Sequence, residues 1–152
     1  MTSLGERFAR QRQRVFVRAL GQTMGLLFPF ALVGAICQLV VHSLLNPDGF
    51  LYAVGYLDYW LSDAALTTLA GAVAALKGVT LGAMGLYAAY AMGKYTARSY
   101  RRDDQLAGLT ALAATLLLSY RLGKGGGGNF SWLYISYGNL LLALLVGYLT
   151  GL

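Results

Sequence analysis

The sequence predicts an all-α fold, a polytopic membrane helix bundle, and three observations lead to this prediction. Of the 152 residues, 57% are hydrophobic and only 12% are charged, whereas soluble globular domains average roughly 45–50% and about 25%. The mean hydropathy is +0.56. The charged residues stand in clusters, and the apolar stretches between them are long enough to cross a bilayer. We therefore expect about four transmembrane helices of roughly 20 residues each.

The composition also excludes several classes of protein. One histidine and one cysteine rule out a disulfide framework, a cysteine-rich zinc module and a metal site with two histidine ligands. The six acidic residues are not paired within any predicted span, so no general acid–base pair lies at membrane depth. No nucleic-acid-binding motif accompanies the basic residues. The sequence therefore predicts neither an enzyme nor a protein that binds a cofactor, a metal or a nucleic acid.

Residues 1–20 are the first predicted element, a basic amphipathic helix. Five arginines are interspersed here with apolar residues such as Phe8 and Phe16. Such a helix can lie on an anionic lipid leaflet; a solvated basic tail that only orients the chain is the alternative. The apolar stretch that follows has no Ala-x-Ala cleavage site before Asn46. Residues 23–45 are therefore predicted to be an uncleaved first span rather than a signal peptide.

The region from residue 64 to residue 97 is predicted to be interrupted. As a single helix it would have 34 residues and a length of about 51 Å, more than a roughly 30 Å hydrocarbon core accepts even with tilt. Lys77 and the following Gly78 predict a break. Residues 64–77 then form a broken helix or interfacial half-helix, and residues 78–97 form the second span.

An outer interfacial segment, residues 46–76, is predicted between the first two spans. It begins with the turn-forming sequence Asn46-Pro47-Asp48-Gly49 and continues with Tyr and Trp residues, which favour the membrane interface. The last two spans are predicted at residues 105–122 and 131–151. Two acidic residues, Asp103 and Asp104, suit the start of the third span because they complement the helix dipole.

The distribution of positive charge predicts the orientation. Residues 1–20 and 94–104 carry nine Lys and Arg, whereas residues 46–63 carry three Asp and no cation. Cytoplasmic loops are enriched in Lys and Arg, so the N-terminus and the 94–104 loop are predicted to be cytoplasmic. Four spans then place the C-terminus on the same side. Arg121 and Lys124 fall on the outer side, against this rule.

Three polar residues of the predicted membrane region are candidate functional positions, and each has a simpler interpretation. Lys77 is an ionisable residue at membrane depth, which marks a functional candidate; a wet interface at the chain break is the alternative. His42 could contact a proton or a substrate, or only hydrogen-bond at a helix end. Gln38 could hydrogen-bond to a neighbouring helix.

Small residues at four-residue spacing predict close helix packing. The pairs Gly78/Gly82 and Gly147/Gly151 are the main candidates, because glycines at this spacing let two helix backbones approach closely. This pattern favours a tight bundle or a homodimer over a wide aqueous pore.

The order of these features resembles a known family. The quoted segments are LLFPFALVGAI (26–36), LGAMGLYAAYAMGKYTARSYRRDDQLAGLTALAATLLL (81–118) and ISYGNLLLALLVGYLTG (135–151). They are similar to the N-terminal part of the membrane subunit, enzyme IIC, of phosphotransferase-system sugar transporters in the lactose/cellobiose/diacetylchitobiose group. The resemblance covers about residues 15–152. The residues that match the family pattern after its basic turn are Asp104, Gly108, Leu109, Leu112, Ala113 and Ala114.

The resemblance implies a scaffold function. In that family the sugar site, with a His and a Glu, lies in a C-terminal half that this chain lacks, so no residue here takes a sugar-binding role. The N-terminal half forms the dimer interface. The chain is therefore expected to be a homodimeric scaffold, assembly or regulatory partner in a bacterial inner membrane, in contact with lipid and sugar-transporter subunits. The alternative is a small transporter or channel whose pathway forms by homo-oligomerisation and is lined by Lys77, His42 and Gln38.

Overall fold

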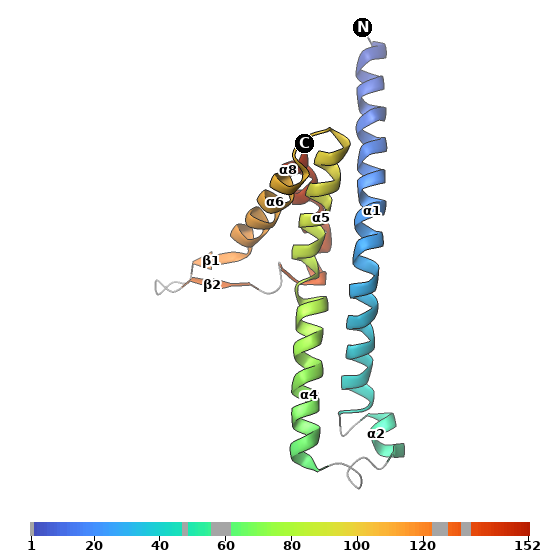
Figure 1. The fold of residues 1–152 in the computed structure, drawn as a ribbon, viewed down its shortest axis with the longest axis vertical. Coiled ribbons are helices and arrows are strands. Elements are labelled where there is room, and N and C mark those ends of the chain that lie inside the picture. The colour runs from blue at the N-terminus through green and yellow to red at the C-terminus, as the bar shows by residue number, and fades with distance from the viewer. Residues whose placement is uncertain (1, 47–48, 56–61, 123–127, 132–134) are drawn as a thin grey trace. The chain divides into compact units, whose positions relative to one another are not determined.

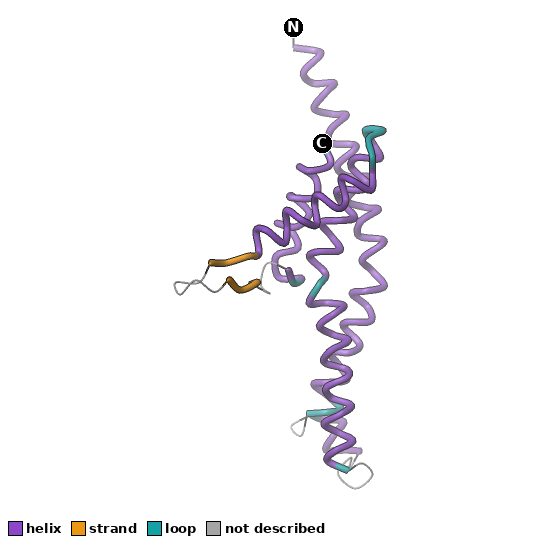
Figure 2. Tube along the Cα trace, turned by 60° about the vertical axis from the view of Figure 1, so that its left-hand side comes forward, coloured by secondary structure: helices purple, strands orange, loops and turns teal. Residues whose placement is uncertain are grey.

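The computed structural model describes residues 2–46, 49–55, 62–122, 128–131 and 135–152. Helices dominate the described chain, and one short antiparallel ladder pairs Tyr120 with Phe130 and Leu122 with Gly128 (Figures 1 and 2). In chain order the elements are α1 (Thr2–Ser43), α2 (Phe50–Gly55), α4 (Asp63–Lys77), the π-helix η1 (Gly78–Gly82), α5 (Met84–Ser99), α6 (Asp104–Ser119), β1 (Tyr120–Leu122), β2 (Gly128–Phe130), the 3-10 helix η2 (Tyr137–Asn139) and α8 (Leu140–Gly151).

The chain divides into two compact units. Unit 1 contains Met1–Phe28 and Ala83–Leu152, and unit 2 contains Pro29–Gly82. Both boundaries fall within helical segments: one lies inside α1, beside Pro29, and the other lies at the end of η1. The all-helical character that the composition predicts is therefore present in both units.

Helix α5 is the centre of unit 1, and it packs against both α6 and α8. Its buried face consists of small residues and two methionines, Met84 and Met92, of which Met92 is fully buried. A Cβ on Gly93 would lie 2.9 Å from the Ala107 carbonyl oxygen of α6, and a Cβ on Gly147 of α8 would lie 2.9 Å from the Met92 Cβ. Only glycine permits backbones to approach so closely, and the close approach extends the dispersion contacts between the helices.

The N-terminal part of α1 packs against this three-helix group. Ala19, Thr23 and Leu27 are each at most 1% exposed, and their four-residue spacing places them on one face of the helix. The Thr23 hydroxyl donates to the Ala19 carbonyl oxygen over 2.8 Å and contacts the Met92 sulfur at 3.7 Å. This apolar stripe attaches the arginine-rich turns of α1 to α5.

In unit 2, α1 meets η1 at a glycine. A Cβ on Gly34 would lie 2.8 Å from the Thr80 hydroxyl and would overlap the Leu81 side chain. Cys37, one turn further along α1, is 6% exposed. After the end of α1 the Gly49 amide donates to the Asn46 carbonyl oxygen over 2.8 Å; the two central residues of the predicted turn, Pro47 and Asp48, lie outside the described residues. Within the predicted outer interfacial segment 46–76, residues 47–48 and 56–61 lie outside the described residues.

Two predicted boundaries are absent from the structure. The expected amphipathic helix 1–20 and first span 23–45 form one helix, α1, which runs from Thr2 to Ser43 with Pro29 inside it. The expected break at Lys77–Gly78 is a π-helical turn, and Gly78 keeps helical dihedral angles of −60° and −43°. The Thr80 hydroxyl donates to the carbonyl oxygens of Leu76 and Lys77 over 2.8 and 3.3 Å. Helical backbone therefore continues through the glycine.

Two helices are long and apolar enough to cross a membrane, Gln11–Ser43 and Ala64–Ser99. The helices found in the regions of the predicted third and fourth spans are shorter. Helix α6 has 16 residues and α8 has 12, so they measure about 24 Å and 18 Å against a hydrocarbon core of roughly 30 Å. The predicted third span is shortened because residues 120–122 form a strand.

Candidate functional site

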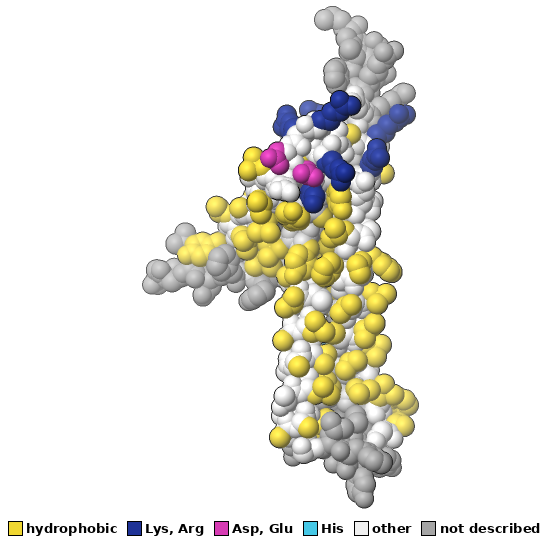
Figure 3. Space-filling view, in the orientation of Figure 1, with side chains coloured by type: hydrophobic (Ala, Val, Ile, Leu, Met, Phe, Trp, Pro, Cys, Tyr) yellow, Lys and Arg dark blue, Asp and Glu magenta, His cyan; other side chains and the backbone are white. Residues whose placement is uncertain are grey.

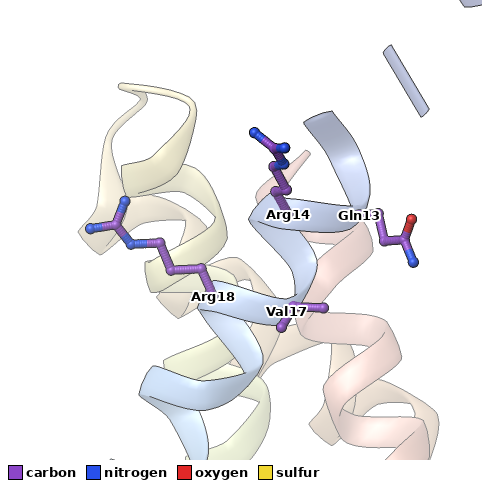
Figure 4. A pocket seen from close by; sticks show the side chains of 4 residues that line it. All are labelled: Gln13, Arg14, Val17 and Arg18. Carbon is purple, nitrogen blue, oxygen red and sulfur yellow. The ribbon is translucent and has the colours of Figure 1, made fainter. Parts of the chain in front are cut away.

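A cationic recess in unit 1 is the most distinctive polar feature of the described chain. It consists of two cavities that share Arg18, and the described residues that line the larger one all belong to α1 (Figure 4). The smaller, of about 290 Å³, lies between α1 and the C-terminal end of α5. The two cavities are lined by Gln13, Arg14, Val17, Arg18, Gln22, Tyr95, Arg98, Ser99 and Arg101.

Helix geometry brings the arginines of the recess together. Arg14 and Arg18 are one turn apart, and Figure 4 shows both side chains leaving the same side of α1. Arg98 lies in the last turn of α5, where cations are favoured by the negative end of the helix dipole. Arg101 follows in the turn to α6, and Figure 3 shows Lys and Arg side chains gathered in this part of unit 1.

Arg101 adopts a backbone conformation that glycine normally takes. Its φ is 56°, the only positive φ of a non-glycine residue among the described ones. Around it the Arg102 amide donates to the Ala97 carbonyl oxygen over 3.0 Å, and the Arg101 amide donates to the Arg98 carbonyl oxygen over 3.2 Å. This hydrogen-bonded C-terminal cap commonly places glycine in the left-handed conformation, where a side chain costs about 1–2 kcal/mol.

None of the described residues that line the recess is acidic, and no described cation forms an ion pair with a described acid. Asp103 is the N-cap of α6, and its carboxylate accepts hydrogen bonds from the amides of Gln105 and Leu106 at 3.1 and 3.2 Å. Lys94 lies over the Tyr90 ring, 5.9 Å from its centroid. Arg18, Arg98 and Arg101 therefore form no ion pair with the part of the chain that is described.

The three predicted polar candidates all lie in unit 2. Lys77 ends α4 and is half-buried, Gln38 is half-buried on α1, and His42 is exposed in the last turn of α1. Gly34 of α1 contacts Thr80 of η1, and the two helices run antiparallel. Gln38 lies one turn after Gly34, and Lys77 lies about one turn before Thr80, so both residues lie at a similar height along the helix pair. Neither side chain makes a hydrogen bond or ion pair with a described residue, and His42 lies a further turn away.

The four predicted packing glycines divide between two environments. Gly147 and Gly151 contact α5, and a Cβ on Gly151 would lie 2.7 Å from the Thr96 Cβ. Gly78 and Gly82 in η1 have nothing within 4 Å of an added Cβ. The first pair thus packs inside the chain, and the second pair leaves an open surface.

Sequence reasoning missed the recess and three close glycine contacts. The arginines were interpreted as topology signals or as the basic face of an amphipathic helix on an anionic leaflet, and not as part of a cavity, although the four-residue spacing of Arg14 and Arg18 places them on one helix face. Three further glycines pack against neighbouring helices: Gly34, Gly93 and Gly108. None of them has a second glycine four residues away, so the search for glycines at four-residue spacing did not identify them.

No cluster of three or more metal-ligating side chains occurs among the described residues. A comparison with protein-family models, with curated proteins and with solved structures finds no match to this chain.

Proposed function

We propose that this chain is a multi-pass protein of a bacterial cell membrane. The observation that carries this proposal is the exposure of its two long apolar helices: only 17% of the most apolar window of each is buried within the chain. The core helix of a soluble protein would be mostly buried. An exposed apolar surface of this size must be shielded from water by something other than this chain. For helices of this length and composition, the lipid bilayer provides that shielding.

Both termini are proposed to be cytoplasmic. Arg18 lines one cavity with Arg98 and Arg101, so the N-terminal helix and the α5–α6 turn belong to the same cationic end of unit 1, as the positive-inside rule requires. Gly151 lies beside Thr96, near that end. Helix α6 leads away from this cationic end, and α8 leads back to it. The C-terminus is therefore on the same side of the membrane as the N-terminus, whether α6 and α8 cross the bilayer or not.

Within that membrane, we propose a scaffold, assembly or regulatory role as a homodimer. The resemblance to the scaffold half of the sugar-transporter membrane subunit supports the role. A stripe of small residues on α4 and η1 supports the dimer. A Cβ at Gly71, Gly78 or Gly82 would meet nothing within 4 Å, so this face is free for a second helix to approach closely.

One preparation tests the proposal. The full chain is reconstituted in lipid nanodiscs, its mass is measured, and β-linked disaccharides are titrated by calorimetry. We expect a dimer that binds no sugar. The double substitution G71L/G78L should yield monomers, whereas Ala72→Leu, a matched change at an exposed position off the stripe, should not. A wild-type monomer contradicts the dimer, and saturable sugar binding contradicts the scaffold role.

The second candidate, an oligomeric transporter or channel, is favoured by one observation. A π-helix directly follows Lys77, and such turns occur frequently at functional sites. If Lys77 lines a pathway, Lys77→Leu should change ion or solute flux in proteoliposomes. Unchanged flux would remove Lys77 from the pathway.

A further inference from the structure

We propose that the cationic recess binds a phosphate group, and specifically the phosphate of an anionic phospholipid headgroup. The site is formed by Arg18 of α1, Arg98 of α5 and Arg101 of the following turn, which line one cavity. The choice of a lipid as the ligand rests on the proposed membrane location. The binding of a phosphate group depends only on residues of unit 1.

The first argument is charge. Three arginines, one each from α1, α5 and the turn that follows α5, line a cavity of about 290 Å³ whose described lining contains no acid. The nearby carboxylate of Asp103 is engaged in capping α6. Guanidinium groups are planar forks whose N–H groups match the spacing of phosphate oxygens and can bind them bidentately. An oxyanion in the recess would relieve the mutual repulsion of the three cations.

The second argument is the conformation of Arg101. Its φ of 56° is unfavourable for any residue with a side chain, and the surrounding hydrogen bonds fit the cap that glycine ordinarily forms. Backbone strain of this kind occurs at ligand-binding sites because the side chain it positions is used there. Here it adds a guanidinium group to a cavity that already holds those of Arg18 and Arg98.

The third argument is the boundary position of the recess. On α1 the helix continues from Arg18 and Gln22 directly into exposed apolar residues, with Phe28 67% exposed, and on α6 Leu106 and Leu109 are 62% and 59% exposed. Gln22 and Tyr95 add neutral hydrogen-bonding groups to the lining. A phospholipid has this same arrangement of an anionic head next to apolar chains, and basic pockets between membrane helices on the cytoplasmic side bind such headgroups.

The test compares two variants of the full chain with equal charge. R98Q/R101Q removes two recess cations, and R12Q/R102Q removes two cations of the same region that line neither cavity. Each protein is purified in an uncharged detergent and checked for helix content and dispersity. Binding of phosphatidylglycerol, phosphatidylcholine and inorganic phosphate is then measured by native mass spectrometry and by the shift in thermal unfolding midpoint, since a ligand of the folded state stabilises it.

We expect wild type and R12Q/R102Q to retain phosphatidylglycerol over phosphatidylcholine, and R98Q/R101Q to bind phosphatidylglycerol at least tenfold more weakly. Equal weakening in both variants, or the absence of both a preference for the anionic lipid and a stabilisation by inorganic phosphate, would overturn the proposal. Inorganic phosphate that stabilises wild type but not R98Q/R101Q, without a lipid preference, would support the phosphate chemistry and assign it to a soluble ligand. The oligomer mass and the sugar titration do not depend on Arg98 or Arg101, so the two proposals fail separately.

Discussion

Phe16 on α1 and Tyr148 on α8 meet edge to face, with ring centroids 5.0 Å apart and ring planes at 89°. The positive edge of one ring then lies against the negative face of the other, which is the preferred arrangement of an aromatic pair. Phe16 lies between Arg14 and Arg18 in the sequence, so this contact attaches the arginine-bearing turns of α1 to α8.

Replacing Phe16 with alanine should loosen this attachment. The aromatic pair contributes about 0.5–1.5 kcal/mol beyond the area it buries, and because Phe16 is 36% exposed, we expect a total loss of about 1–2 kcal/mol. Unfolding in mixed micelles, followed by circular dichroism, measures the loss. Phe28→Ala is the control, since Phe28 is 67% exposed. Equal losses in the two variants would contradict a specific role for the Phe16–Tyr148 contact.

Substituting Gly147 should separate α8 from α5. The added Cβ of Gly147→Ala would lie 2.9 Å from the Met92 Cβ and 3.1 Å from the Gly93 amide nitrogen, and the overpacking should cost about 1–3 kcal/mol of the free energy of unfolding. Gly25→Ala provides the control, because a Cβ there meets nothing within 4 Å. That change should stabilise α1 by about 0.5–1 kcal/mol through its higher helix propensity. A Gly147→Ala protein as stable as Gly25→Ala would show that the α5–α8 packing is looser than described.

Cys37 can report on the α1–η1 packing in unit 2. It is the chain's single cysteine and is buried, so an apolar coumarin maleimide should label it only when heat opens unit 2. In Gly34→Leu the side chain collides with Thr80 and Leu81, and labelling should begin at a lower temperature. Gly21→Leu adds the same side chain at a position with nothing within 4 Å and should leave the midpoint unchanged. Equal midpoints in the two variants would argue against the Gly34 contact.

The sequence predicts helix identity better than helix boundaries. Apolar periodicity and composition indicated helices that are present, and the two acids before the third predicted span do begin α6, with Asp103 as its N-cap. Lys77 and Gly78 looked like a break because glycine weakens a helix, whereas the Thr80 hydroxyl bonds to the carbonyl oxygens of Leu76 and Lys77. Gly78 itself keeps helical dihedral angles, and a prediction from glycine propensity alone does not include the side-chain bonds of Thr80.

The candidate site was harder to predict than the fold. Arg18 and Arg101 are separated by more than eighty positions in the sequence, and they line one cavity only because α1 packs on α5 through Ala19 and Thr23. Charge counting identified both arginine clusters as topology signals but carried no information about which helices meet. The positive φ of Arg101 is likewise set by the turn between α5 and α6, and an arginine there predicts no glycine-like conformation.

Replacing Arg101 with glycine should raise the stability of the protein and weaken its binding of phosphatidylglycerol. Glycine takes a φ of 56° without steric penalty, so relief of the strain should raise the free energy of unfolding. The gain should reach at most about 1 kcal/mol, because glycine also gives the unfolded chain more entropy. The same change removes one cation from the recess, so phosphatidylglycerol binding should weaken as stability rises. Denaturation and lipid titration on one preparation measure both.

Arg102→Gly is the matched control, because it removes the neighbouring cation, which does not line the recess and does not have a positive φ. It should lower stability slightly and leave phosphatidylglycerol binding intact. If Arg101→Gly lost stability as Arg102→Gly does, the left-handed conformation would carry no strain. If Arg101→Gly kept full affinity for phosphatidylglycerol, Arg101 would not belong to the phosphate site. A strained residue that contacts the ligand should, when replaced, raise the stability of the protein and lower its affinity for the ligand.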